Sequence, residues 1–192
     1  MKIENRNQIL FKANFINKIS VGKIINKNHA KYDSLDVSFV RIDPSNKQDI
    51  NALEDAAKYW EYDKFAKNIY YAACALRNKS KYYKDNNVYA LTYQTSDFKN
   101  MNSNKILGLV QTSHLFEDSL FIEHLQVNPR LVYEIKPEYK GVGTAILSSL
   151  KWLYNKISCC PSVEKYVKNF YIKNGFKKEE GVLNYYVWEQ KL

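Results

Sequence analysis

Gly141 and Gly143 flank Val142 in a short loop that follows Lys140 and comes directly before an apolar stretch. Glycine has no side chain, so a diphosphate can approach the backbone of such a loop closely. Where the loop opens a helix, its N–H groups can donate hydrogen bonds to phosphate oxygens, and the helix dipole adds about 0.3–1 kcal/mol. The spacing suits a phosphorylated ligand, although the same Gly-x-Gly also occurs in an ordinary tight turn.

The residues on either side of this loop predict the strand, loop and helix order of a phosphate site. Residues 120–127, upstream, have the apolar character of a strand. Downstream, Ala145, Ile146, Leu150 and Leu153 recur at helical spacing. The loop is therefore expected at the start of a helix, where its N–H groups would be free.

Two stretches around the loop resemble the signature regions of the GNAT acetyltransferases, which transfer an acetyl group from acetyl-CoA to an amine. The first stretch is FIEHLQVNPRLVYEIKPEYKGVGTAILSSLKWLYNK, residues 121–156, and the second is NFYIKNGFKK, residues 169–178. The resemblance implies direct transfer to an amine acceptor, without a covalent acyl-enzyme. The acceptor could be a protein lysine or N-terminus, a small amine or an aminoacyl-tRNA.

The resemblance also implies that the pantetheine arm of CoA lies along the strand before the loop. In the family this strand splays from its neighbour, and its exposed backbone groups hold the arm. The matching residues in this chain are Leu125, Gln126 and Val127.

By the same resemblance, the diphosphate is expected on the N–H groups at the start of the following helix. The matching residues are Gly141, Val142, Gly143 and Thr144. The family commonly has a basic residue or glutamine three positions before the first of these glycines, where this chain has Glu138. Because a carboxylate beside a diphosphate is unfavourable, we expect Glu138 to point away and Lys140 to supply the positive charge.

Acetylation of an amine needs a base for the amine's proton and an acid for the departing thiolate. Glu123 matches the place where some histone-acetylating GNAT enzymes have a glutamate, so it is the candidate base. Alternatively, a bound water is the base, or Glu123 is only a solvated residue on the polar face of the strand. Tyr171 matches a tyrosine that often lies near the cofactor sulfur, so it is the candidate acid. The alternative is that Tyr171 only packs against other residues. Strict alternation along the strand would point His124 to the face opposite Glu123.

The histidines and cysteines match no metal-ligand spacing, so we expect no metal site. Cys74 lies in an apolar helical stretch, and Cys159 and Cys160 are neighbours. Free thiols of this kind agree with a cytoplasmic location.

The predicted order of elements agrees with the same family, whose domains begin with a strand and two helices before three strands. The predicted elements are a strand at 35–42, helices at 50–60 and 65–76, strands at 88–95, 106–116 and 120–127, a helix at 145–157, a strand at 157–160, a helix ending near 174 and a strand at 182–189. A tight turn at 117–119 would make the strands beside it antiparallel. This order predicts an α+β fold, with a mixed, mostly antiparallel sheet flanked by helices. Residues 1–34 are expected to form an N-terminal extension packed on one domain, 35–192.

The composition leaves other functions open. The net charge of +9 favours anionic partners, such as nucleic acid or a phosphorylated cofactor. A non-catalytic GNAT-like module that binds CoA or a partner, or a basic RNA-binding domain, is therefore the alternative to an enzyme. No apolar run approaches the roughly 20 residues that span a bilayer, and the first residues do not resemble a secretory signal. We therefore expect a cytoplasmic protein.

Overall fold

The computed structural model describes residues 14–26, 28, 31–60, 65–96, 98, 100–116, 119–132 and 137–190. Its strands are β1 (Asn14–Asn26), β2 (Lys31–Arg41), β3 (Asn86–Thr92), β4 (Ile106–Phe116), β5 (Ser119–Val127), β6 (Tyr139–Lys140), β7 (Lys156–Cys159), β8 (Lys177–Lys178) and β9 (Tyr186–Glu189). They form one sheet in the order β6-β1-β2-β3-β4-β5-β7-β9-β8. Neighbouring strands are antiparallel except β5 and β7, which are parallel. The predicted mixed, mostly antiparallel sheet is thus confirmed.

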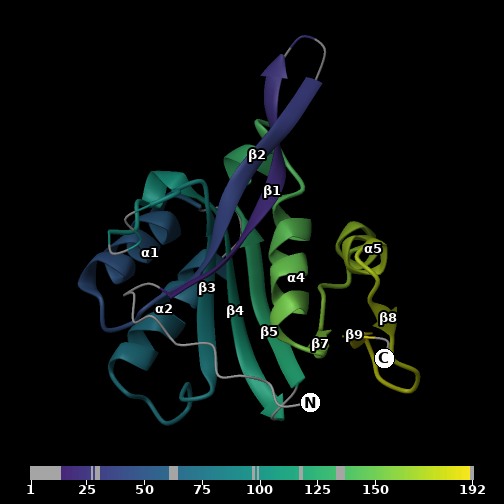
Figure 1. The fold of residues 1–192 in the computed structure, drawn as a ribbon. Coiled ribbons are helices and arrows are strands. Elements are labelled where there is room, and N and C mark those ends of the chain that lie inside the picture. The colour runs from purple at the N-terminus through teal and green to yellow at the C-terminus, as the bar shows by residue number, and fades with distance from the viewer. Residues whose placement is uncertain are drawn as a thin grey trace, which may run out of the picture.

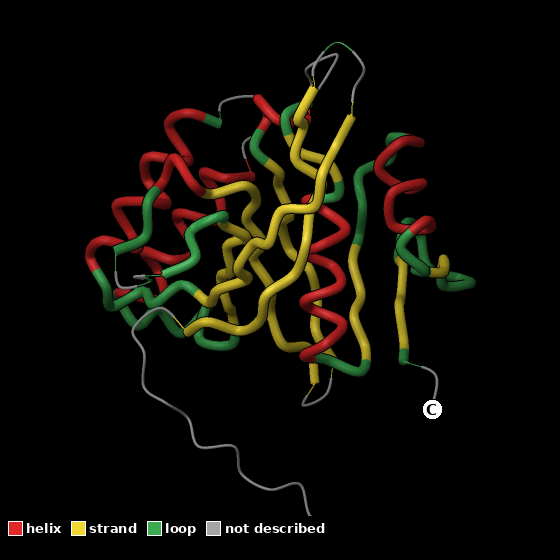
Figure 2. The backbone as a smooth tube through the Cα atoms, turned by 45° about the horizontal axis from the view of Figure 1, so that its top comes forward, coloured by secondary structure: helices red, strands yellow, loops and turns green. Residues whose placement is uncertain are grey.

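The helices cover both faces of this sheet (Figures 1 and 2). They are α1 (Lys47–Tyr59), α2 (Phe65–Arg77), α3 (Pro129–Val132), α4 (Val142–Leu153) and α5 (Lys165–Lys173), with a 3₁₀ turn η1 (Ser103–Lys105). α1 and α2 pack on one face and α4 packs on the other. The predicted helices before β3 and after the glycine loop are therefore present.

Two hydrophobic cores hold these layers together, because side chains alternate along each strand. On β4, Leu109 belongs to the core under α1 and α2, whereas Val110 belongs to the core under α4. Gly108 permits close packing of α4: a methyl group on its Cα would lie 2.6 Å from Cδ1 of Ile146. The start of α4 is thereby held next to the start of β4 and the end of β5.

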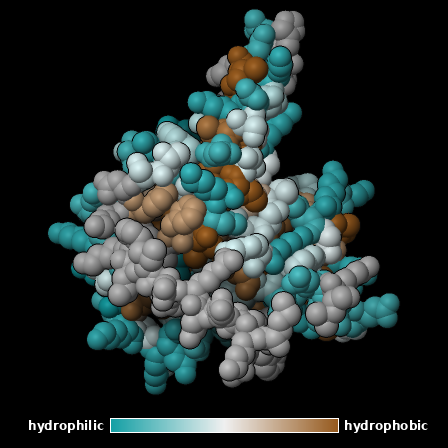
Figure 3. Space-filling model, viewed as in Figure 1, coloured by the Kyte–Doolittle hydropathy of each residue, from teal (hydrophilic) through white to brown (hydrophobic). Residues whose placement is uncertain are grey.

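β1 and β2 form a long hairpin that projects from the body of the molecule, which we call the arm (Figures 1 and 3). The arm carries both polar and apolar residues along its length in Figure 3. β1 pairs along its length with β2, and its residues Gly22 and Lys23 pair with Lys140 and Tyr139 of β6. The sequence did not predict β1, and β2 begins at Lys31 rather than at residue 35.

The described part of the segment before residue 35 therefore belongs to the central sheet. Residues 1–13 lie outside the described residues, as do residues 117 and 118 of the predicted turn. β4 and β5 on either side of that turn are antiparallel, as predicted. Within the part of the chain that the structure describes, every helix is too short or too polar to cross a membrane.

Candidate functional site

β5 and β7 run side by side for only part of the length of β5. They pair in parallel over four residue pairs, the last of which joins Ile122 and Cys159. β7 ends there, whereas β5 continues to Val127 with β4 on its other edge. Among the described residues, no strand pairs with the β7-facing edge of β5 at 123–127. Backbone groups on this edge are therefore open to a ligand.

Glu123 lies at the point where the two strands separate. The register between β4 and β5 skips one residue of β5 between Ile122 and His124, which makes Glu123 the extra residue of a β-bulge. The Glu123 side chain is exposed, and its carboxylate accepts a hydrogen bond from Ser113 Oγ at 2.6 Å. Bulges re-aim side chains and are frequent next to active sites.

The bulge corrects the expectation that Glu123 and His124 point to opposite faces. Ser113, which binds Glu123, shares a face of β4 with Leu109, in the core under α1 and α2. The ring of His124 stacks on Phe65 of α2, with the ring centroids 5.2 Å apart. One extra residue breaks the alternation, so both side chains lie on the α2 side of the sheet.

The imidazole of His124 is held on this face by α2. One ring nitrogen lies 3.3 Å from Asn68 Nδ2. Burial lowers the pKa of His124 below its ordinary value of 6.5, and the charge of Glu123 acts in the opposite direction. The ring of His124 therefore favours its neutral form at pH 7.

The side chains of the three residues matched to the pantetheine site have structural roles. Gln126 is buried, accepts a hydrogen bond from Ala66 N at 2.6 Å and donates one to Trp60 O at 3.5 Å. It thereby joins the end of α1 and the start of α2 to β5. Leu125 and Val127 pack against the core under α4. A ligand on this strand would therefore meet backbone rather than side-chain groups.

The predicted glycine loop leads directly into α4. Gly141 is the residue before the helix, and its φ of 80° lies in the left-handed region that favours glycine. The first helical bond runs from Ala145 N to Gly141 O at 2.8 Å, and no side chain caps this end. The N–H groups of Val142, Gly143 and Thr144 therefore have no acceptor within the helix.

The arm holds the residue that precedes this loop. Lys140 is exposed and pairs with Gly22 of β1. Its Nζ lies 4.1 Å from the centroid of the Tyr32 ring, a cation–π contact. The Tyr32 hydroxyl in turn donates to Pro137 O at 2.8 Å. Sequence reasoning missed Tyr32, because nothing local indicates that a residue more than 100 positions earlier meets the loop.

α5 lies beside the place where β5 and β7 separate. Tyr171 is only 6% exposed, and its ring meets those of Phe170 and Phe176 at centroid distances of 5.1 and 5.3 Å. Burial raises the pKa of Tyr171 far above its ordinary value of 10.0, and the neighbouring Cys159 raises it further. Cys159 belongs to the last residue pair between β5 and β7. Tyr171 is thus near this point, and its hydroxyl stays protonated.

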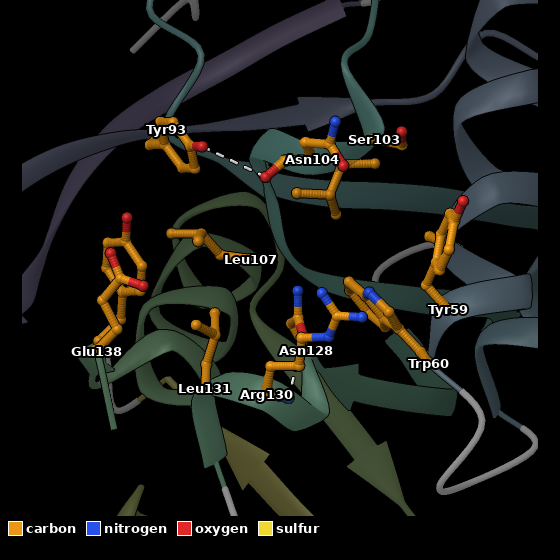
Figure 4. Close-up of a pocket in the computed structure, with 13 residues that line it drawn as sticks. Tyr59, Trp60, Tyr93, Ser103, Asn104, Leu107, Asn128, Arg130, Leu131 and Glu138 are labelled. Atoms are coloured by element: carbon orange, nitrogen blue, oxygen red, sulfur yellow. Dashed lines mark hydrogen bonds between the residues drawn. The ribbon is translucent and has the colours of Figure 1, made fainter. Parts of the chain in front are cut away.

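Glu138 lines a pocket of about 340 Å³ between the end of α1, the start of β4 and the loop before α4 (Figure 4). Burial raises the pKa of Tyr139, which also lines the pocket, to about 12, and the adjacent Glu138 carboxylate adds to the shift. Trp60, Tyr93 and Arg130 also line this pocket. Sequence reasoning missed these three residues, because they come from separate elements and share no motif.

Within the described ranges, no group of three His, Cys, Asp or Glu residues is placed to hold a metal ion. Three elements that carry predicted site residues, β5, the start of α4 and α5, come together at Gly143. A methyl group on Gly143 would lie 3.0 Å from Phe170 Cζ and 3.7 Å from Val127 Cγ2, so these three elements meet at the glycine loop.

Comparison with known proteins supports the fold. No protein-family model matches the chain, and no curated protein matches its sequence. One similar structure, from Desulfovibrio desulfuricans and assigned to the GNAT family of acetyltransferases, is 14% identical in sequence to this chain and has a TM-score of 0.52. The matched region covers 80% of this chain and 98% of the other chain. The PaiA N-acetyltransferase of Thermoplasma acidophilum, in complex with coenzyme A, is 15% identical, with a TM-score of 0.49, and covers 81% and 99%. The chain has the GNAT fold, as shown by the first of these similarities together with the strand order and the parallel β5–β7 pair.

Proposed function

We propose that this protein is an acetyl-CoA-dependent N-acetyltransferase. The observation that carries the proposal is the separation of β5 from β7 after Ile122 and Cys159. An open strand edge beside a helix start can bind an elongated ligand through backbone groups, with an anionic end at the helix. Acetyl-CoA has this shape and charge, and it supplies the acyl thioester.

The residues of the described site fit such a ligand. Free N–H groups at 142–144 suit a diphosphate, and Gly141 leaves open space there, because a methyl on its Cα would meet no atom within 4 Å. The edge of β5 at Leu125, Gln126 and Val127 would hold the pantetheine arm. Lys140 adds a positive charge beside the loop, although its ammonium lies on the Tyr32 ring.

For the reaction itself, we propose that Glu123 takes the proton of the attacking amine, directly or through a water. Its carboxylate is exposed and oriented by Ser113, so an acceptor can reach it. Tyr171 is the proposed donor to the departing thiolate. Because burial raises the pKa of Tyr171, a hydrogen bond to the thiolate is favoured over complete proton transfer.

The acceptor is an amine. Protein lysines, N-termini, small amines and aminoacyl-tRNA all remain candidates, and the net charge of +9 favours an anionic acceptor. The alternative is a module with this fold that binds CoA or RNA without catalysis.

Calorimetry and acetyl-transfer assays distinguish these functions. We expect acetyl-CoA to bind and to raise the melting temperature, since a ligand at 100 times its Kd stabilises a protein by about 2.7 kcal/mol. We also expect thiol release from acetyl-CoA in the presence of amines. Binding without thiol release would favour the non-catalytic module. RNA binding without CoA binding would contradict the proposal.

A further inference from the structure

The pocket beside Glu138 has the size and lining of a small-molecule site. Its volume of about 340 Å³ falls at the lower end of the range of about 300–1,000 Å³ that is usual for ligand pockets. It therefore suits a single amino-acid-sized group rather than the face of a folded protein. Four aromatic residues line it: Tyr59, Trp60, Tyr93 and Tyr139.

Two opposite charges face this pocket without pairing to each other. Glu138 is half-buried and Arg130 is exposed, and no ion pair joins them among the salt bridges of the described residues. In Figure 4, Glu138 lies near Tyr93 on one side of the pocket, and Arg130 lies near Trp60 on the other. The Glu138 carboxylate is close enough to Tyr139 for its charge to add to the rise in the pKa of Tyr139 that burial causes. Each charge is thus available to a ligand.

The aromatic walls favour the same kind of ligand. The faces of Tyr and Trp rings attract an ammonium and also cover an apolar body. The Tyr93 hydroxyl is engaged with Asn104 O at 3.3 Å. The pocket therefore combines a site for positive charge, a site for negative charge and apolar walls for the body of the ligand.

We propose that this pocket binds a small zwitterion, with its ammonium at Glu138, its anionic group at Arg130 and an apolar or aromatic body against the rings. A ligand with only positive charges would be repelled by Arg130, and a ligand with only negative charges would be repelled by Glu138. The inference goes beyond the proposed function, because an ammonium held by Glu138 is not the amine whose proton Glu123 would take.

The pocket is also connected to the proposed reaction site. The carbonyl of Trp60, in the pocket wall, accepts a hydrogen bond from Gln126 of β5. Glu138 precedes the glycine loop by three positions. The carboxylate that stands where the family has a basic residue would therefore serve this ligand rather than the cofactor.

Calorimetry on the full chain with three small probes tests the proposal. L-Phenylalanine carries both an ammonium and a carboxylate, L-phenylalanine amide carries only the ammonium, and 3-phenylpropionate carries only the carboxylate; all three have a phenyl ring. We expect the zwitterion to bind at least about tenfold more tightly than either singly charged probe, because it alone satisfies both side chains. This comparison needs no variant. Equal affinity for the three probes, or no binding at millimolar concentrations, would overturn the inference.

Two variants then assign the charges. Glu138→Gln should weaken binding of the two ammonium probes about tenfold and strengthen binding of 3-phenylpropionate, because the repulsion is removed. Arg130→Gln should weaken binding of the two carboxylate probes and strengthen binding of L-phenylalanine amide. The exposed Glu179→Gln and Arg77→Gln serve as controls that should change nothing. If both pocket variants behave as wild type, the assignment is wrong.

A separate titration with CoA keeps the two proposals apart. CoA binding without zwitterion binding would remove the zwitterion site and leave the proposed function standing. Zwitterion binding with the expected charge pattern, but without CoA binding, would remove the proposed function and leave the pocket.

Discussion

The ring of Phe170 in α5 lies against Gly143 in the first turn of α4. A methyl group on the Cα of Gly143 would lie 3.0 Å from Cζ and 3.1 Å from Cε2 of that ring. Such distances are tighter than ordinary carbon contacts. Gly143 is therefore required for packing between α4 and α5, whether or not a phosphate approaches its N–H group.

We expect Gly143→Ala to destabilise the protein by about 1 kcal/mol, because overpacking of about 1–3 kcal/mol exceeds the 0.5–1 kcal/mol by which Ala stabilises a helix over Gly. In a Phe170→Leu background the same change should be neutral or stabilising. Urea denaturation of the four proteins measures the coupling. Strictly additive effects would show that the ring is not the cause.

Gly141 offers a cleaner test of the diphosphate site, because a side chain there has open space. Asn and Asp both tolerate the left-handed conformation, so Gly141→Asn and Gly141→Asp differ mainly by one negative charge. We expect calorimetry to show CoA affinity falling about tenfold more for Asp than for Asn, because like charges repel. Equal affinities would place the diphosphate elsewhere.

The role of Glu123 can be tested by Glu123→Gln, which keeps the shape of an exposed side chain. We expect kcat to fall by about 10²–10⁴, the range usual for a lost general base, with unchanged acetyl-CoA affinity. Ser113→Ala, which removes the hydrogen bond at 2.6 Å, should cause a smaller loss because the carboxylate remains. Unchanged turnover in Glu123→Gln would favour a water as the base.

Tyr171→Phe removes one hydroxyl and keeps the buried ring. We expect turnover to fall by about 10²–10⁴, nearer the lower end, at constant acetyl-CoA affinity. Because the pKa of Tyr171 is raised above 10.0, its hydroxyl stays protonated at neutral pH, so the loss should not vary with pH there. A normal turnover number in the variant would return Tyr171 to a packing role.

Asp49, which is fully buried at the start of α1, predicts a pH dependence of stability. Burial raises its pKa from 3.8 to about 6, although a hydrogen bond from Asp43 N at 3.0 Å opposes the shift. The folded chain therefore binds a proton that the unfolded chain has released. The stabilisation of the folded state that this bound proton provides is fully present below pH 3.8 and is lost as the pH rises through about 6.

The free energy of unfolding should fall by about 3 kcal/mol over this pH range, because the pKa of Asp49 is shifted by about two units. Asp49→Asn should remove that part of the pH dependence, as measured by urea denaturation at acidic and neutral pH. Asp33→Asn, at an exposed position, is the control and should leave it unchanged. If the Asp49 variant keeps the pH profile of the wild type, burial does not perturb this carboxyl group.

Much of the fold could be predicted because its signals are local. Apolar residues from Ala145 to Leu153 recur every three or four positions, and α4 covers this stretch. β4 has the predicted bounds, 106–116. The glycine loop was expected at a helix start, and Gly141 does precede α4. In each case, neighbouring residues alone determine the periodicity or the turn.

The tertiary structure decided what depends on register and on contacts between distant segments. The bulge at Glu123 arises from pairing with β4, and it turns Glu123 to the same side as His124, which strict alternation does not allow. β1 is stabilised by its pairing with β2 and β6 rather than by a strand-like pattern in its own sequence. Arg130 of α3 and Glu138 of the loop before α4 share a pocket only because these two segments come together beside the end of α1. A sequence pattern records spacing along the chain, whereas these features depend on which elements lie side by side in space.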